Sequence, residues 1–226
     1  MNTMLRDIRL IIYDLDGVLI DSREAIVETF NRVLDELGAD RYPAEAIKEM
    51  IGEPLVDMYM RALPPSMHHL IPHCYERYVA IYRELAPGSV SLLPGVEETL
   101  THFRALSLRQ SIATTKRSDV AAYILRRLDV AHLLDLVLGV NDVESPKPSP
   151  EIIELTLQRL MVERGAAVFI EDTTIGLEAG RGAGVHTVAV TTGTHSRERL
   201  LSASPDYVID DIRGLKAIIG VAEETQ

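Results

Sequence analysis

The sequence predicts an α/β protein: a doubly wound, Rossmann-like parallel sheet with an α-helical domain inserted into it. Short, continuously apolar runs alternate with amphipathic helical patterns over most of the 226 residues, and such alternation is typical of a parallel sheet covered by helices. One long interval near the N-terminus contains helical patterns and no strand pattern. The chain length suits one large domain or a core that carries an insertion.

The predicted strands are short runs in which apolar residues follow one another without alternation. This pattern favours strands that are buried on both faces. The runs span residues 8–13, 110–114, 136–138, 166–170, 186–190 and 207–209. Between them, apolar residues recur at helical spacing over 96–106, 119–128, 150–160 and 175–182. Because strands and helices alternate in this way, we expect a doubly wound sheet.

Residues 22–87 follow a different pattern, since only helices are predicted after the first strand. These helices cover 23–37, 44–50, 55–63 and 67–85, and Pro72 interrupts the last of them. A strand-free block of this length does not belong inside an alternating α/β series. We therefore expect a core domain made of residues 1–21 and 88–226, with residues 22–87 inserted as a helical cap domain.

The composition limits the possible partners and location. The chain has 23 Lys and Arg against 34 Asp and Glu, a formal charge of −11, and this overall field repels nucleic acid. The single cysteine, Cys74, fits a reducing compartment. The apolar runs are too short for a signal peptide or a membrane helix. We expect a cytoplasmic protein, a monomer or homodimer, without nucleic-acid or membrane partners.

Two carboxylates follow the first predicted strand, at Asp14 and Asp16. In an open parallel sheet, ligands bind beyond the carboxyl ends of the strands. Strand alternation places both side chains on the same side. Two such carboxylates repel each other by about 4 kcal/mol at an effective dielectric constant near 20. They therefore require a cation or a shared proton.

A second acidic pair, Glu171 and Asp172, follows the strand predicted at 166–170. Several carboxylates that meet at one sheet edge call for a hard cation with oxygen ligands, and Mg²⁺ suits a site that also binds phosphate. The alternative is that these two residues only cap the next helix.

Anion-binding groups follow two further strands. Thr114 and Thr115 offer hydroxyl and backbone N–H groups at a strand-to-helix turn, where anions bind readily. Lys147 lies between two prolines on a stiff loop and can present its charge to a phosphoryl oxygen. Each signal alone is weak, because a threonine at a helix start is usually a cap and a loop lysine is usually solvated.

This order of motifs resembles the haloacid dehalogenase superfamily of phosphohydrolases, in the subfamily with a C1 helical cap. The resemblance covers almost the whole chain, and its four motifs fall at Asp14-Leu15-Asp16-Gly17, Thr114, Lys147-Pro148 and Glu171-Asp172. It implies that Asp14 is the nucleophile and forms an aspartyl-phosphate. It also implies that Asp16 is the general acid toward the leaving group and then the base toward water.

The same resemblance implies how the substrate and the metal are bound. Thr114 and Lys147, with Thr115 beside them, would hold the phosphoryl oxygens, and Lys147 would also compensate the charge of the nucleophile. Mg²⁺ would be bound by Asp14, the backbone carbonyl of Asp16, Asp172 and Glu171.

Five positions bear on the branch of the family. Val18 stands where many members have Thr, and Gly176 stands where many have a second Asp of motif four. This variant resembles phosphosugar mutases. Ile26 occupies the place of the cap-hinge histidine of β-phosphoglucomutases, which argues against a mutase. Gly52 and Glu53 lie in a stretch that resembles phosphoglycolate phosphatases, and we expect them to set substrate specificity from the cap.

The sequence therefore predicts a Mg²⁺-dependent phosphatase for a small, phosphoglycolate-like phosphorylated metabolite. The alternatives are a mutase of the β-phosphoglucomutase type and an inorganic pyrophosphatase, since Thr114-Thr115-Lys116 is similar to bacterial pyrophosphatases. A receiver-like signalling module is the non-enzyme alternative, because it also gathers Asp, Thr and Lys at strand ends. Such modules are much shorter and lack a helical cap.

Overall fold

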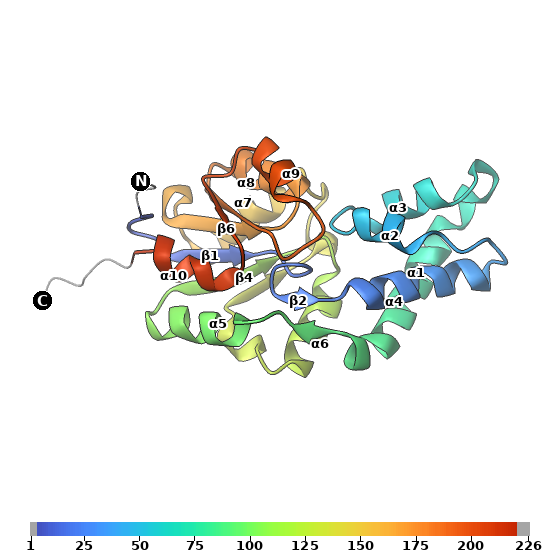
Figure 1. Ribbon diagram of the computed structural model, residues 1–226, viewed down its shortest axis with the longest axis horizontal. Coiled ribbons are helices and arrows are strands. Elements are labelled where there is room, and N and C mark those ends of the chain that lie inside the picture. Colours follow the sequence, from blue (N-terminus) through green and yellow to red (C-terminus); the bar gives the residue numbers. More distant parts are fainter. Residues whose placement is uncertain (1–3, 221–226) are drawn as a thin grey trace, which may run out of the picture.

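The computed structural model describes residues 4–220 and contains a parallel six-stranded sheet (Figure 1). The strand order is β5-β4-β1-β6-β7-β8. The strands are β1 (Leu10–Tyr13), β4 (Arg109–Ala113), β5 (Leu136–Leu138), β6 (Ala167–Glu171), β7 (His186–Val190) and β8 (Tyr207–Ile209). The predicted α/β fold with a doubly wound parallel sheet is confirmed.

The alternating faces of β1 explain why its apolar run is unbroken. Ile11 and Tyr13 pack with helices α5 (Val96–Ala105), α6 (Ser118–Arg127) and α10 (Leu215–Ile218). Leu10 and Ile12 pack on the other face with α7 (Glu151–Leu160) and α8 (Thr174–Ala183). Both faces of the strand are thus removed from water, which an alternating sequence could not achieve. Helix α9 (Arg197–Ser202) packs beside α8.

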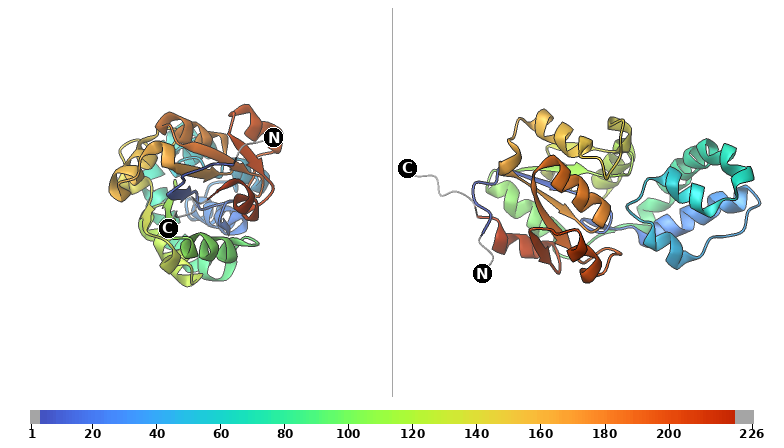
Figure 2. Two further views of the ribbon diagram at one scale, coloured as in Figure 1. Left: turned by 90° about the vertical axis from the view of Figure 1, so that its left-hand side faces the viewer. Right: turned by 90° about the horizontal axis from the view of Figure 1, so that it is seen from above.

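Four helices form a separate group beside the carboxyl edge of the sheet (Figures 1 and 2). We call them the cap helices: α1 (Arg23–Glu36), α2 (Ala44–Glu49), α3 (Leu55–Ala62) and α4 (Ile71–Ser89). The chain enters and leaves them through a two-stranded antiparallel ribbon of β2 (Ile20–Asp21) and β3 (Ser91–Leu92). This arrangement supports the predicted division into core and cap, whose boundaries stay a prediction.

The prediction that Pro72 interrupts a helix over 67–85 is wrong. A 3-10 helix spans Pro65–Leu70 and α4 then begins at Ile71, so Pro72 lies in its first turn. The first helical N–H groups have no partner within the helix, so a proline there removes no hydrogen bond. Pro72 thus starts the long cap helix.

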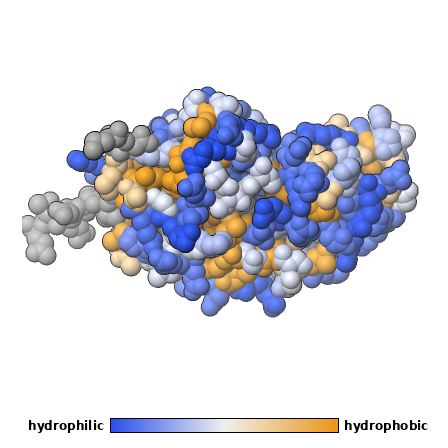
Figure 3. Space-filling model, in the orientation of Figure 1, coloured by the Kyte–Doolittle hydropathy of each residue, from blue (hydrophilic) through white to orange (hydrophobic). Residues whose placement is uncertain are grey.

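The face of the molecule in Figure 3 is largely hydrophilic, with apolar residues in smaller patches. This distribution agrees with the large excess of acidic residues in the chain. Within residues 4–220, none of the helices has the combination of length and apolar character needed to traverse a lipid bilayer.

Candidate active site

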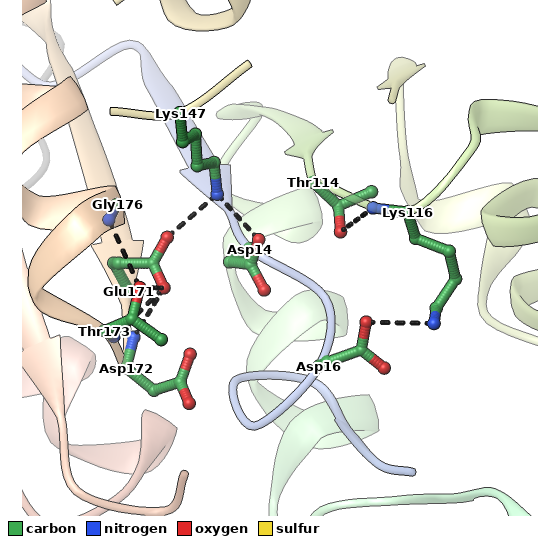
Figure 4. A network of polar contacts seen from close by, with 9 residues as sticks. All are labelled: Asp14, Asp16, Thr114, Lys116, Lys147, Glu171, Asp172, Thr173 and Gly176. Atoms are coloured by element: carbon green, nitrogen blue, oxygen red, sulfur yellow. Dashed lines mark hydrogen bonds and ion pairs between the residues drawn. The ribbon is translucent and has the colours of Figure 1, made fainter. Parts of the chain in front are cut away.

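The candidate site lies where three adjacent strands end. Asp14 follows β1 directly, Thr114 follows β4, and Glu171 is the last residue of β6. The backbone ladder continues just past the strands, since the N–H of Asp14 donates to Ile170 O at 2.9 Å. Because β1 lies between β4 and β6, side chains from segments far apart in sequence meet at one edge (Figure 4).

Three carboxylates form a compact buried cluster. Asp14, Glu171 and Asp172 each place one oxygen within 4.8 Å of the others. All three residues are buried. Like charges this close in a poorly hydrated site repel strongly, and the cluster needs compensating positive charge.

Lys147 supplies part of that charge. Its Nζ lies 2.7 Å from Asp14 Oδ1 and 2.8 Å from Glu171 Oε2, and the side chain is only 3% exposed. Burial, the largest influence, lowers the pKa of Lys147, but attraction to Asp14 and Glu171 outweighs it and the pKa is raised. The lysine is therefore a fixed cation between two carboxylates.

The pKa values of two carboxyl groups reflect their burial first and the neighbouring negative charge second. Burial raises the pKa of Asp14 to about 7, with Lys147 opposing this and Glu171 and Asp16 adding to it. Burial also raises the pKa of Asp172 well above its ordinary value, and Glu171 and Asp14 contribute. Further positive charge would favour the ionised forms of both groups.

The cluster has the chemistry of a divalent-cation site. Three carboxylates and one ammonium group leave a formal charge of −2. The buried Asp172 Oδ2 has no hydrogen-bond partner among the described residues, and a Cβ atom on Gly17 or Gly193 would overlap it. Both glycines thus leave room around a free oxygen ligand. Hard oxygen donors in this number fit Mg²⁺.

Glu171 is held more tightly than the other carboxylates. Its Oε1 accepts hydrogen bonds from the N–H of Asp172 at 3.0 Å, the N–H of Thr173 at 3.1 Å and the hydroxyl of Thr173 at 3.0 Å. A Cβ atom at Gly176 would overlap Glu171 Oε2. The glutamate therefore fills the space that a motif-four side chain at position 176 would need, which explains the glycine there.

The alternative that Glu171 and Asp172 only cap the following helix is wrong. Thr173 is the N-cap of α8, and its side chain accepts from the N–H of Gly176 at 3.2 Å. The two carboxylates are left facing the cluster.

Asp16 lies apart from the three clustered carboxylates (Figure 4). The hydroxyl of Ser22 donates to its Oδ1, and Lys116 Nζ lies 3.2 Å from its Oδ2. The structure thus gives the side chain of Asp16 a position beside the cluster, between the sheet edge and the cap helices. A metal contact through its backbone carbonyl stays a prediction.

The predicted anion-binding threonines lie in the turn after β4. Thr114 is buried, and its Oγ1 accepts from the N–H of Lys116 at 3.2 Å. Its hydroxyl hydrogen remains available to a ligand oxygen. Thr115 lines a cavity between this turn and the cap helices.

That cavity encloses about 590 Å³, including its opening to solvent. Gly52 and Glu53, the predicted cap residues, line it together with Asp16. Gly52 has a φ of +100°, and a Cβ atom there would lie 2.7 Å from Cγ2 of Thr173. The cap loop therefore touches the residue that holds Glu171.

Sequence reasoning missed several residues around the site. Lys116 was noted only in a motif, yet it pairs with Asp16. The turn after β7 was given no role, although Gly193 lies against Asp172 and Thr192 Oγ1 donates to Gly17 O at 2.6 Å. The sequence offers one signal for these residues: each of the two turns follows a predicted parallel strand, where ligands bind.

Residues 11–190 match the family model described as haloacid dehalogenase-like hydrolase. A solved structure, a haloacid dehalogenase-like family hydrolase from Streptococcus pneumoniae, superposes with a TM-score of 0.83 at 27% sequence identity. The superposition covers 93% of this chain and 98% of that one. Core and cap are thus both shared with the solved protein.

Three relatives align over most of the chain. The probable phosphatase IndB of Dickeya dadantii is 32% identical over 206 residues, 89% of each protein. Pyrophosphatase PpaX of Bacillus velezensis is 29% identical over 93% of this chain and 96% of its own length. The phosphoglycolate phosphatase of Pseudomonas putida is 27% identical over 92% of this chain and 78% of its own length.

Fold, site and relatives together define the class: an enzyme, a phosphatase-type hydrolase. The chain belongs to the haloacid dehalogenase-like hydrolase family, whose model covers most of its length. The resemblance seen in the motif order is confirmed at this level. The receiver-like signalling module finds no support, because the matched family and the named relatives are hydrolases.

Proposed function

We propose that this protein is a Mg²⁺-dependent phosphatase that hydrolyses a small phosphorylated metabolite through an aspartyl-phosphate on Asp14. One observation carries the proposal: Asp14 is buried beside Asp172, and Lys147 bridges it to Glu171. A carboxylate that attacks a phosphate dianion meets repulsion, and clustered positive charge at that point removes it.

In the first half of the reaction, one carboxylate oxygen of Asp14 forms a bond to phosphorus as the bond to the leaving oxygen breaks. Lys147 already contacts Asp14 Oδ1, so its charge is in place when the nucleophile attacks. Asp16 donates a proton to the leaving oxygen. Mg²⁺, held by Asp14, Asp172 and Glu171 with the backbone carbonyl of Asp16, would supply further charge neutralisation.

In the second half, Asp16 takes a proton from a water molecule, whose oxygen attacks phosphorus. The bond between phosphorus and Asp14 breaks, which releases phosphate and restores the carboxylate. One acid/base residue thus serves both steps because its protonation state alternates. Thr114 and Thr115 lie on the neighbouring strand end, where their hydroxyl and N–H groups can bind the phosphoryl oxygens.

Transfer of the phosphate to water fits the cap better than transfer back to a sugar. Ile26, which takes the place of the histidine in β-phosphoglucomutases, is a buried apolar wall of the cavity. It cannot exchange a proton with a second hydroxyl group. Phosphoglycolate, the substrate type that the sequence suggests, and pyrophosphate are the first compounds to test, because relatives carry these names. Cytoplasmic location and a monomeric or homodimeric state remain part of the proposal.

Phosphate release from phosphoglycolate, pyrophosphate and hexose phosphates, with and without Mg²⁺, tests the function. We expect release that depends on Mg²⁺ and that Asp14→Asn abolishes, because an amide neither attacks phosphorus nor carries charge. Circular dichroism of the variant controls for folding. Full turnover by the folded Asp14→Asn variant would reject Asp14 as the nucleophile.

A further inference from the structure

The cavity beside Asp16 has walls that are mostly apolar. Aliphatic side chains from both sides of the cleft line it: Ile26, Ile51, Leu55, Met58, Val79 and Val120. The cap helices contribute most of them, and Val120 comes from α6 of the core. An apolar group that enters this cavity leaves water, which is favourable by roughly 25 cal/mol per Å² of apolar surface.

Three tyrosines complete the wall along α4. They are Tyr75, Tyr78 and Tyr82, and the rings of Tyr78 and Tyr82 stack with centroids 5.7 Å apart. Burial raises the pKa of Tyr78 and of Tyr82, so both phenols stay uncharged. Flat, neutral rings of this kind suit contact with another ring.

The charged side chains that line the cavity are already paired. Lys116 Nζ lies 3.2 Å from Asp16 Oδ2 and 4.3 Å from the centroid of the Tyr82 ring. Glu53 pairs with Arg61 at 2.7 Å. The remaining cation of the lining, Arg117, pairs with Asp119 at 2.9 Å. A second anionic group on the substrate would compete with Asp119 for Arg117, and with Asp16 for Lys116 for as long as Asp16 is ionised.

The position of the cavity identifies what it binds. Asp16, the proposed proton donor to the leaving oxygen, lies in its wall, whereas Asp14 and Lys147 lie outside it. The cavity is therefore where the leaving group of a phosphate ester would extend.

We propose that this cavity selects phosphate monoesters whose leaving group is uncharged and largely apolar. Substrates with an anionic leaving group, such as the ester phosphoglycolate or the anhydride pyrophosphate, are then poorer, because burying an unpaired charge among apolar side chains is costly. The inference rests on the proposed phosphatase function and specifies its substrate class.

Four substrates test the proposal: benzyl phosphate, methyl phosphate, phosphoglycolate and pyrophosphate. The first three are esters of primary alcohols, so their intrinsic reactivity is similar and the cavity decides between them. We expect kcat/KM for benzyl phosphate to exceed the other three values at least tenfold. In apolar pockets, one methylene group more or less on the substrate already changes kcat/KM by about 10- to 200-fold. Equal or faster turnover of phosphoglycolate or pyrophosphate overturns the inference and leaves the phosphatase intact.

A pair of variants on α3 tests the wall itself. Leu55 lines the cavity at the first position of the helix, where asparagine is tolerated, whereas its neighbour Val56 is exposed. We expect Leu55→Asn to lower kcat/KM for benzyl phosphate at least fivefold more than for methyl phosphate. Val56→Asn should leave both values unchanged. An equal loss of kcat/KM for both substrates in Leu55→Asn contradicts the proposal. If the unmodified protein releases phosphate from none of the four substrates, the phosphatase function itself is rejected.

Discussion

Thr173 shows how one residue can serve the helix, the acidic cluster and the cap together. Its hydroxyl caps α8 through Gly176 N–H and donates to Glu171 Oε1. Its methyl group faces Gly52 of the cap loop. The hydroxyl of this side chain therefore orients a carboxylate, and its methyl group contacts the cap.

Two substitutions test the role of the hydroxyl. Thr173→Val removes the cap of α8 and one donor to Glu171, so we expect a loss of about 1 kcal/mol in the free energy of unfolding and weaker Mg²⁺ binding. Thr173→Ser keeps the hydroxyl and should retain both properties. Urea unfolding and the shift of Tm with added Mg²⁺ measure them. Identical behaviour of the two variants would show that the hydroxyl has no such role.

At this scale the sequence predicts the strand-end residues well and the loop contacts poorly. Asp14 and Glu171 had to converge, because parallel strands place their carboxyl ends at one edge. The pairing of Lys116 with Asp16 instead depends on how deeply the cap buries the turn after β4. No local pattern encodes that depth, so the sequence does not predict the partner of Lys116.

The first turn of helix α8 is hydrogen-bonded to a histidine from a turn further along the chain. Its first residue, Thr174, donates its N–H to Nδ1 of His195 at 3.1 Å. His195 lies in the turn between β7 and α9 and is buried. The bond exists only when Nδ1 carries no proton. Burial, followed by the charge of Arg199, lowers the pKa of His195 to about 4.

This bond predicts a pH dependence of stability. Between pH 6.5 and about 4, the unfolded chain binds a proton at His195 that the folded chain does not, so stability falls as pH falls. The ring keeps some solvent contact, so we expect less than about 1.4 kcal/mol per pH unit from this group. His195→Asn keeps an acceptor that cannot titrate, and urea unfolding at several pH values should show a shallower decline. A slope equal to that of the unmodified protein would contradict this role.

The sequence predicts a helix or a strand where the apolar residues of that segment form a local pattern. The six strands of the main sheet follow from continuous apolar runs, and the main helices follow from apolar residues at helical spacing. The sequence does not show whether a proline lies in the first turn of a helix or inside it. It therefore predicts an interruption at Pro72, where the structure has the first turn of α4. A 3-10 helix separates α3 from α4, and no local pattern in the sequence shows that α4 begins directly after it.

The whole molecule is a core and a group of cap helices that meet over the carboxylate cluster. Gly52 is one point where they approach closely, since its missing side chain lets the cap loop reach Thr173 beside Asp172. The cap loop thus contacts the core beside the carboxylate cluster, and it lines the cavity together with Asp16, the proposed proton donor. Contact between a cap and a core at such a place limits the access of bulk water.

Gly52→Ala should therefore impair turnover more than stability. The backbone at Gly52 has a positive φ, so alanine costs about 1 kcal/mol of folding free energy, and its methyl group would also press on Thr173. Gly38→Ala is the matched control, because Gly38 has a φ of +67° and open space around it. We expect both variants to lose similar stability in urea unfolding, and only Gly52→Ala to lose at least tenfold in kcat/KM. If the two variants retain equal activity, contact between the cap loop and Thr173 is not required for catalysis.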